Sequence, residues 1–567
     1  MKGKAIVFFS VYILSGLCGY AQEATQAPHF SHADTLRGSL NPQRTWWKVL
    51  RYDISVQPDY GTKTISASNT ITYRTLASGS QTMQIDLMAP LVIDRIVDGF
   101  GKKVAFRSID SGVYHLYIQP TSRNASGGPG NTSHEGMTRS VTISYHGKPI
   151  EAVHPPWEGG WIWAKDALGR PWMSVACQGL GASAWYPCKD YQGDEPDSGA
   201  SLSITVPDTL TAIGNGRLQS RTSRGDGLVT YRWEVKNPIN NYDIIPYIGK
   251  YVGWHSQYQG EKGKLDCDFW VLDYELDKAR QQFKQVDTML RCFEYWMGPY
   301  PFYEDGYKLV QSPHLGMEHQ SAVAYGNHFA NGYLGKDLSG TGWGLLWDFI
   351  IVHESGHEWF GNNITTRDLA DMWVHEGITN YSETLYTTCR SGVEAGNAYC
   401  LGTRNKIRND KPIIGYYGVN NKGSGDMYYK GGNMMHTIRQ IIQDDEKFRQ
   451  VLRGLNRDFY HQTVSSEQVE RYISLHGGRD LSKVFDQYLR TTLIPDLQYQ
   501  VKGTSLQYRW ASCVPGFDMP LKVKVGADVY WLEPVQQWKT LPLKTADPGQ
   551  VTLVADPNFY VTTHKME

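Results

Sequence analysis

The first part of the chain alternates apolar and polar residues in the manner of β-strands. Between about residues 48 and 252, segments such as 52–56, 64–68 and 141–145 alternate or are rich in β-branched residues, with Gly, Pro and Asp between them. A period of two residues with turn residues between the runs predicts a mainly β region. Strand patterns return after about residue 496.

The middle of the chain follows the 3.6-residue period of helices instead. Helical periods occur in residues 277–296, 344–360, 369–389, 432–442 and 447–459. We find no internal repeat.

These patterns predict a multidomain α+β protein, because long β and helical runs follow one another rather than alternate. We expect an N-terminal all-β domain over residues 40–255, a mostly helical domain over 256–490 and a small C-terminal β domain over 491–567. A length of 567 residues agrees with several domains rather than one.

Residues 1–21 have the pattern of a secretory signal peptide. Two lysines precede the apolar run 5–17, and small residues lead up to a predicted cleavage site after Ala21. Lipid attachment at Cys18 is the alternative, although Leu17 stands where a small residue is expected. No later run reaches about 18 apolar residues, so we expect no transmembrane segment in the mature chain and a secreted or periplasmic location.

Composition and charge exclude some classes of partner. Lys and Arg total 56 against 57 Asp and Glu, which gives a formal net charge of -1. Such a balance gives no reason to expect a nucleic-acid partner.

Eight cysteines allow disulfides if the chain is exported. The pairs close in sequence are Cys177 with Cys188 and Cys389 with Cys400. Buried thiols are the alternative for all four.

The segment HESGH at residues 353–357 is the strongest chemical signal. Apolar residues before it predict a buried helix, on which His353 and His357 project from one face. Zinc needs about four ligands, one of them water in a catalytic site, so a third protein ligand is required. Glu376, 19 residues after His357 in a helical stretch, can supply it, whereas the competing pattern with a third His fails because Asn363 stands at that position.

Two further carboxylates have predicted roles around this metal. Glu354 lies between the two histidines and can act as the general base on the attacking water. Glu383 is two helical turns beyond Glu376 and can accept the distal N–H of a histidine ligand.

With these motifs the chain resembles the aminopeptidase N family of zinc metallopeptidases, which includes leukotriene hydrolase. The segment Leu315-Gly316-Met317-Glu318-His319 is similar to the family's Gly-x-Met-Glu-Asn strand. The resemblance implies that Glu318 binds the free α-ammonium of a peptide and that the backbone of Gly316 and Met317 pairs with it.

Two more motifs extend the resemblance over nearly the whole mature chain. The segment beginning Tyr428-Tyr429-Lys430 is similar to the family's Tyr-x-Lys-Gly, which implies that Tyr428 rather than Tyr429 donates to the oxyanion. A segment beginning at Cys177 resembles the part of the β domain that contributes a glutamine, hence Gln178.

The resemblance also implies a fold and an activity. The fold is a saddle-like β domain, a thermolysin-like catalytic domain with one zinc ion, and a C-terminal region that is here small and β rather than large and helical. The activity is that of a zinc aminopeptidase acting on peptides with a free N-terminus. A zinc endopeptidase and an inactive binding protein are the alternatives, and an epoxide hydrolase side activity is a further one.

Two residues depart from the family's strand. Leu315 replaces a glycine and is expected to crowd the strand, and His319 replaces an asparagine. A protonated His319 would compete with a substrate amine for Glu318, so we expect this histidine to affect amine binding.

Overall fold

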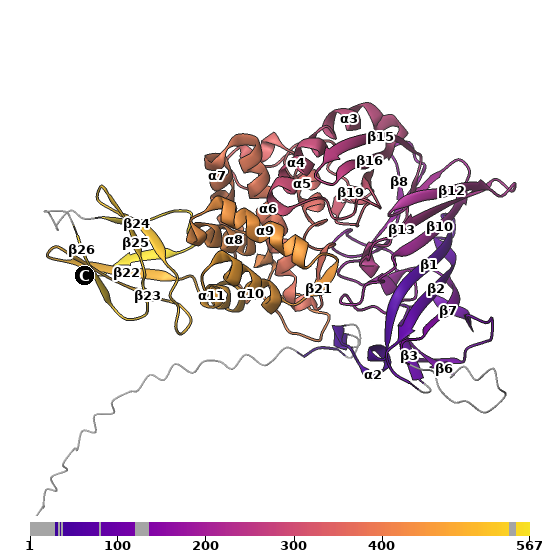
Figure 1. Ribbon diagram of the computed structural model, residues 1–567. Coiled ribbons are helices and arrows are strands. Elements are labelled where there is room, and N and C mark those ends of the chain that lie inside the picture. The colour runs from indigo at the N-terminus through magenta and orange to yellow at the C-terminus, as the bar shows by residue number, and fades with distance from the viewer. Residues whose placement is uncertain are drawn as a thin grey trace, which may run out of the picture.

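The computed structural model describes residues 29–31, 34–35, 38–78, 81–119, 135–543 and 552–566. The predicted signal peptide, 1–21, lies outside these residues. Three regions follow one another along the molecule, with N-terminal strands at one end, helices in the middle and C-terminal strands at the other end (Figure 1). The prediction of a multidomain α+β fold with this order is confirmed.

The N-terminal region consists of three sheets. The largest has the strand order β12-β13-β10-β1-β2-β7-β4, and its long strands β1 and β2 pair antiparallel with Tyr52 opposite Ile71. The strands of these sheets are β1 (Trp47–Asp59), β2 (Thr64–Thr75), β3 (Gln81–Asp86), β4 (Val92–Asp98), β5 (Phe106–Asp110), β6 (Val113–Ile118), β7 (Thr138–Gly147), β8 (Gly160–Lys165), β9 (Pro171–Ala176), β10 (Ala200–Pro207), β11 (Thr211–Ile213), β12 (Arg217–Ser223), β13 (Leu228–Val235) and β14 (Tyr247–Gly249). A short helix, α2 (Pro42–Thr45), precedes them.

A five-stranded sheet joins this region to the helices. Its strands are β15 (Tyr251–Gly260), β16 (Gly263–Leu272), β17 (Tyr307–Gln311), β18 (Gly316–Met317) and β19 (Val323–Tyr325), in the order β15-β16-β17-β19-β18. The predicted domain boundary near residue 256 therefore falls inside a strand of this sheet.

The sheet also separates two hydrophobic cores. On β19, Val323 and Tyr325 pack into the core of the helices, whereas Ala324, like Ala322 just before the strand, packs into the core of the N-terminal strands. This division follows from the alternation of side chains along a strand. Strand β18 lies at the edge of the sheet, between the two cores.

The helical region contains nine α-helices among the described residues. They are α3 (Leu276–Gln282), α4 (Gln285–Met297), α5 (Phe349–Gly356), α6 (Trp373–Ser391), α7 (Val393–Thr403), α8 (Tyr429–Ile442), α9 (Asp445–Asp458), α10 (Ser466–Gly477) and α11 (Ser482–Arg490). A small parallel sheet of β20 (Ile364–Thr366) and β21 (Gln462–Val464) accompanies them. The helical periods in the sequence predicted most of these helices, but they did not predict α7, α10 or α11.

The C-terminal region forms two small sheets, as expected. Their strands are β22 (Asp496–Lys502), β23 (Ser505–Ala511), β24 (Leu521–Val525), β25 (Asp528–Leu532), β26 (Lys539–Pro542), β27 (Leu553–Ala555) and β28 (Thr562–Lys565). Trp510 and Phe517 of this region belong to the same hydrophobic core as the helices. No helix among the described residues is both long and apolar enough to cross a membrane.

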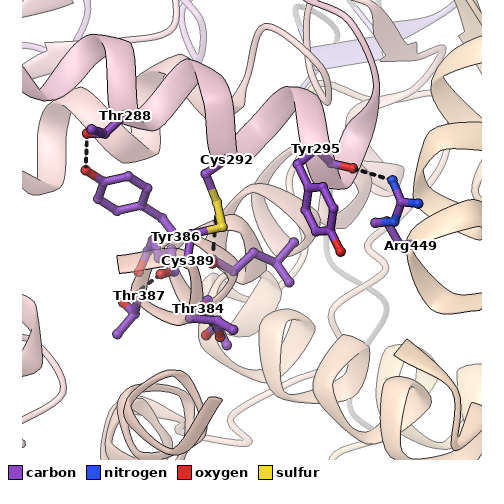
Figure 2. Close-up of a disulfide and its surroundings, with 11 residues drawn as sticks. Thr288, Cys292, Tyr295, Thr384, Tyr386, Thr387, Cys389 and Arg449 are labelled. Carbon is purple, nitrogen blue, oxygen red and sulfur yellow. Dashed lines mark hydrogen bonds between the residues drawn. A yellow bond between two sulfur atoms is a disulfide. The ribbon is translucent and has the colours of Figure 1, made fainter. Parts of the chain in front are cut away.

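Neither disulfide suggested by closeness in sequence forms, and the alternative of buried thiols holds for three of the four cysteines. Cys389, at the end of α6, is joined to Cys292 of α4, 97 residues away in sequence (Figure 2). Cys400 is a buried thiol, and the Cys177 thiol donates to the Tyr242 carbonyl oxygen rather than pairing with Cys188. The pairs chosen by closeness in sequence fail because the packing of α4 against α6, not chain separation, brings two sulfur atoms together.

Candidate functional site

Helix α5 presents the two histidines. The helix begins at Phe349, later than the predicted start at residue 344, because the Asp348 carboxylate accepts from the N–H groups of Ile350 and Ile351 and caps the first turn. His353 lies inside the helix and His357 directly follows its last residue, so the two imidazoles are one turn apart.

Each imidazole is fixed through its Nδ1 atom. His353 Nδ1 lies 2.8 Å from Glu383 Oε1, and the Nδ1 of His357 lies 3.0 Å from the carbonyl oxygen of Phe360. A ring whose Nδ1–H donates to an oxygen has a lone pair on Nε2. Both Nε2 atoms are therefore available as ligands, and Glu383 lies where the sequence placed it.

Glu376 completes a three-ligand group. Its Oε2 lies 3.3 Å from His357 Nε2 and 3.8 Å from His353 Nε2, and one ligand atom from each residue lies within 4.8 Å of the others. All three residues are buried. Two imidazole nitrogens, whose rings are already hydrogen-bonded through Nδ1, and one carboxylate fit a zinc ion that keeps one open position.

Close backbone packing places Glu376 against the start of α8. A Cβ added to Gly377 would stand 2.8 Å from the Met427 carbonyl oxygen and 3.2 Å from the Cα of Gly431. In the same way, a Cβ on Gly431 would meet the Gly377 Cα at 2.9 Å. These two glycines let α6 and the start of α8 approach closely, which brings Glu376 and Tyr428 to one place.

Glu354 is buried beside the histidines. Burial raises the pKa of its carboxyl to about 7, against the opposing effect of His353 and His357. Strand β18 passes so close that a Cβ on Gly316 would lie 2.6 Å from Glu354 Oε1. Glycine at this position therefore leaves room for the carboxylate.

Glu318 lies directly after β18 and is held by two donors. Gln178 Nε2 and the Tyr242 hydroxyl both donate to its Oε1, the latter at 3.1 Å. One oxygen of Glu318, one oxygen of Glu354 and one nitrogen of His357 lie within 4.8 Å of one another. The structure thus brings Glu318 and Gln178, which are far apart in sequence, to the edge of the three-ligand group.

Met317 and Gly316 form the edge strand itself. Gly316 pairs with Tyr325 and Met317 with Ala324 on one side only, so the other side of β18 is an edge of the sheet. Such an edge can pair with an extended peptide.

Two neighbouring tyrosines face different groups. The ring of Tyr428 lies 6.1 Å from the His353 ring, and burial, followed by the Glu376 carboxylate, raises its pKa well above the ordinary value. For Tyr429 burial, then Glu383 and then Tyr333 raise the pKa. Tyr428 is therefore the tyrosine next to the ligand group.

His319 is turned away from this group. Its Nδ1 lies 2.8 Å from the Tyr247 hydroxyl, which itself donates to the Ala322 carbonyl oxygen. Burial lowers the pKa of His319 well below its ordinary value. The imidazole is thus neutral, and the expected competition of a protonated His319 for Glu318 does not arise in this arrangement.

Sequence reasoning missed three residues around Glu318. Besides Tyr242, these are Asn362, which donates to the Glu318 carbonyl oxygen at 2.8 Å, and Lys422, which donates to Gln178 Oε1 at 2.5 Å. No local motif marks any of them, because each lies on a separate segment that only folding brings here.

Comparisons with known proteins match the helical region to one family model and give several relatives of the chain. Residues 285–488 match the family model described as the peptidase family M1 domain. Leukotriene A-4 hydrolase of Xenopus laevis is 22% identical over 449 residues, which cover 75% of this chain and 68% of that protein. Aminopeptidase B of Homo sapiens is 23% identical over 438 residues, which cover 70% of this chain but only 63% of that protein. Leucine aminopeptidase 2 of Vanderwaltozyma polyspora is 24% identical over 341 residues, covering 57% of this chain and 45% of that protein.

Solved structures show the same fold. A variant of an M1 zinc metallopeptidase from Deinococcus radiodurans, bound to a Tyr-Ser-Ala substrate, has a TM-score of 0.64 at 19% identity. A two-domain M1 zinc metallopeptidase variant bound to L-tryptophan has a TM-score of 0.66, also at 19% identity. In both cases the superposition covers 80% of this chain and 96% of the other chain.

Proposed function

Because residues 285–488 form a peptidase family M1 domain, we propose that the protein is a zinc-dependent aminopeptidase that removes N-terminal residues from peptides. Zinc is the metal, and His353, His357 and Glu376 are its ligands. When bound, it acts as a Lewis acid that polarises the scissile carbonyl and makes water more acidic. The remaining steps depend on side chains of this chain.

Glu354 serves as the general base. Its carboxylate takes a proton from the attacking water and passes it to the leaving amine, the two transfers of a general base placed beside the metal ligands. The Tyr428 hydroxyl donates to the oxygen that becomes negatively charged in the transition state. Its high pKa keeps the proton on the phenol at neutral pH, so it remains a donor.

The observation that carries the proposal is the position of Glu318. This buried carboxylate lies within 4.8 Å of both a Glu354 oxygen and a His357 nitrogen, and the side chains of Gln178 and Tyr242 hold it in place. An α-ammonium bound there sets the first peptide bond, rather than an internal one, next to Glu354. An N-terminus pairs with a carboxylate through charge-assisted hydrogen bonds, which mid-chain backbone cannot do.

The test compares one peptide with a free and with an acetylated N-terminus. We expect kcat/KM for the free peptide to be higher by roughly 10–150-fold, the equivalent of a charge-assisted hydrogen bond of about 1.5–3 kcal/mol. Addition and removal of a chelator controls for metal dependence. A ratio near one would identify an endopeptidase, and no turnover of either peptide would identify a binding protein.

We also propose that the chain is exported. Residues 1–21 have a signal-peptide pattern, and the Cys292–Cys389 disulfide is suited to an oxidising compartment. N-terminal sequencing of the mature protein should begin at Gln22. A lipid-modified Cys18 at the N-terminus would instead establish a membrane anchor, and an intact Met1 would contradict export by this route.

A further inference from the structure

A positive charge ends a hydrogen-bond chain that begins at Glu318. Gln178 donates through Nε2 to Glu318 Oε1 and accepts through Oε1 from Lys422 Nζ. Only this orientation of the Gln178 amide satisfies both neighbours, because a carboxylate accepts and an ammonium donates. Lys422 therefore lies one amide group away from the carboxylate that we assign to the substrate amine.

The loop that carries Lys422 is fixed to the turn that precedes α6, the helix of Glu376. The Tyr417 hydroxyl donates to Asp371 Oδ1 at 2.7 Å, and the Gly418 N–H donates to Asp368 Oδ2 at 2.8 Å. Both aspartates belong to the turn that leads directly into α6. The position of the lysine is thus set relative to the site.

The chain is equally constrained on the other side of Lys422. A Cβ on the next residue, Gly423, would stand 1.7 Å from the carbonyl oxygen of Ile413. The Lys422 side chain is therefore held from both sides of the loop, and its ammonium points at Gln178.

The charge of Lys422 is available to a ligand. Its hydrogen bond to Gln178 goes to a neutral amide oxygen, and this contact leaves the positive charge uncompensated. The side chain is half-buried. Its contact Gln178 also holds Glu318, so the ammonium lies close to where a bound amino-terminal residue would sit. A partly desolvated ammonium there favours an anionic group.

We propose that Lys422 selects peptides whose first residue has an acidic side chain, Asp or Glu. The inference rests on the proposed aminopeptidase function. With the α-ammonium on Glu318, the side chain of the first residue extends from the carbon next to that amine, so its carboxylate is within reach of an ammonium one amide away. Basic first residues are disfavoured by like charge.

The experiment measures kcat/KM for free-amine tripeptides Glu-Ala-Ala, Gln-Ala-Ala and Lys-Ala-Ala. For the wild type we expect the Glu peptide to exceed its neutral, nearly isosteric Gln counterpart by about tenfold or more. Lys422→Met should bring this ratio to about one, and Lys422→Glu should make the Lys peptide the best of the three. Lys411→Met, which removes an exposed lysine of the same loop, should leave the ratio unchanged.

Three results would overturn the inference. They are a Glu to Gln ratio near one in the wild type, an unchanged ratio in Lys422→Met, and an equal loss on all three peptides in Lys422→Met, which would make Lys422 a positioning residue for Gln178. If the wild type cleaves none of the free-amine peptides, the proposed function fails and the inference with it. Melting temperatures show whether each variant is folded.

Discussion

The two sides of the site are built in different ways. The metal side comes from three helices of one region, α5, α6 and the start of α8, and its key distances follow from helix geometry and a glycine contact between helices. The amine side combines Glu318 after an edge strand, Gln178 and Tyr242 from the N-terminal region, and Lys422 from a long loop. One side is therefore specified by local periodicity and the other by the assembly of distant segments.

This difference suggests a division of roles. Residues on rigid helices hold their geometry within the small tolerance that chemistry needs. Residues on loops and edge strands can change without disturbing that geometry, which is where binding preferences are expected. Variants on the metal side should therefore reduce turnover of every substrate, and variants on the amine side should change which substrate is preferred.

The largest effect should come from Glu354→Gln. The amide keeps the shape of the side chain but cannot act as a base, so kcat should fall by about 10²–10⁴-fold for all peptides while zinc is retained. Steady-state kinetics measure kcat, and metal analysis measures the zinc content. The control is Glu394→Gln, on the exposed surface of α7, which should have the kcat and zinc content of the wild type. Activity of Glu354→Gln within threefold of the wild type would assign the base to another residue.

Tyr428→Phe should have the next largest effect. The lost hydroxyl acts mainly in the transition state, so kcat should fall by roughly 10²–10³-fold with little change in KM. Tyr429→Phe is the matched control, because it removes the same hydroxyl from the neighbouring residue. A large loss in Tyr429→Phe alone would mean that the neighbouring tyrosine performs this role.

Glu318→Ala tests the amine side of the comparison. We expect kcat/KM of free-amine peptides to fall by roughly 10–150-fold, with little further change for acetylated ones, because only the free amine pairs with this carboxylate. The measurement is kcat/KM for the free and the acetylated form of one peptide. An equal loss on both forms would show that Glu318 supports the chemistry itself, which would contradict the proposed division between the metal side and the amine side.

Glu383→Gln should have the smallest effect and act on metal binding. Glu383 accepts from His353 Nδ1, Asn380 and Tyr399, and its charge makes His353 a better ligand. Zinc affinity should fall by about 10–100-fold, with kcat near normal at saturating zinc. Competition with a chelator measures the affinity, and an unchanged value would contradict the role of Glu383.

Helix-encoded features were accessible from sequence. The spacing of His353, His357 and Glu376 predicted a group that the structure brings together, and Glu383 follows from the same periodicity. The predicted start of α5, residue 344, was too early. Asp348, a polar residue inside an apolar run, caps the helix, so α5 begins only at Phe349. The roles of these residues in catalysis stay predictions until the variants are measured.

Features that depend on distant segments needed the structure. The sequence suggested Glu318 and Gln178 only through a resemblance, and it suggested neither Tyr242 nor Lys422.

The sequence by itself determined the order of β, helical and β regions and the face of each metal-side helix, because the periods of strands and helices act over a few neighbouring residues. Only the tertiary structure decided that Cys389 joins Cys292, that His319 turns to Tyr247, and that Lys422 reaches Glu318 through Gln178. These contacts join residues tens to hundreds of positions apart, and packing against the whole core, rather than any local pattern, sets which of them meet.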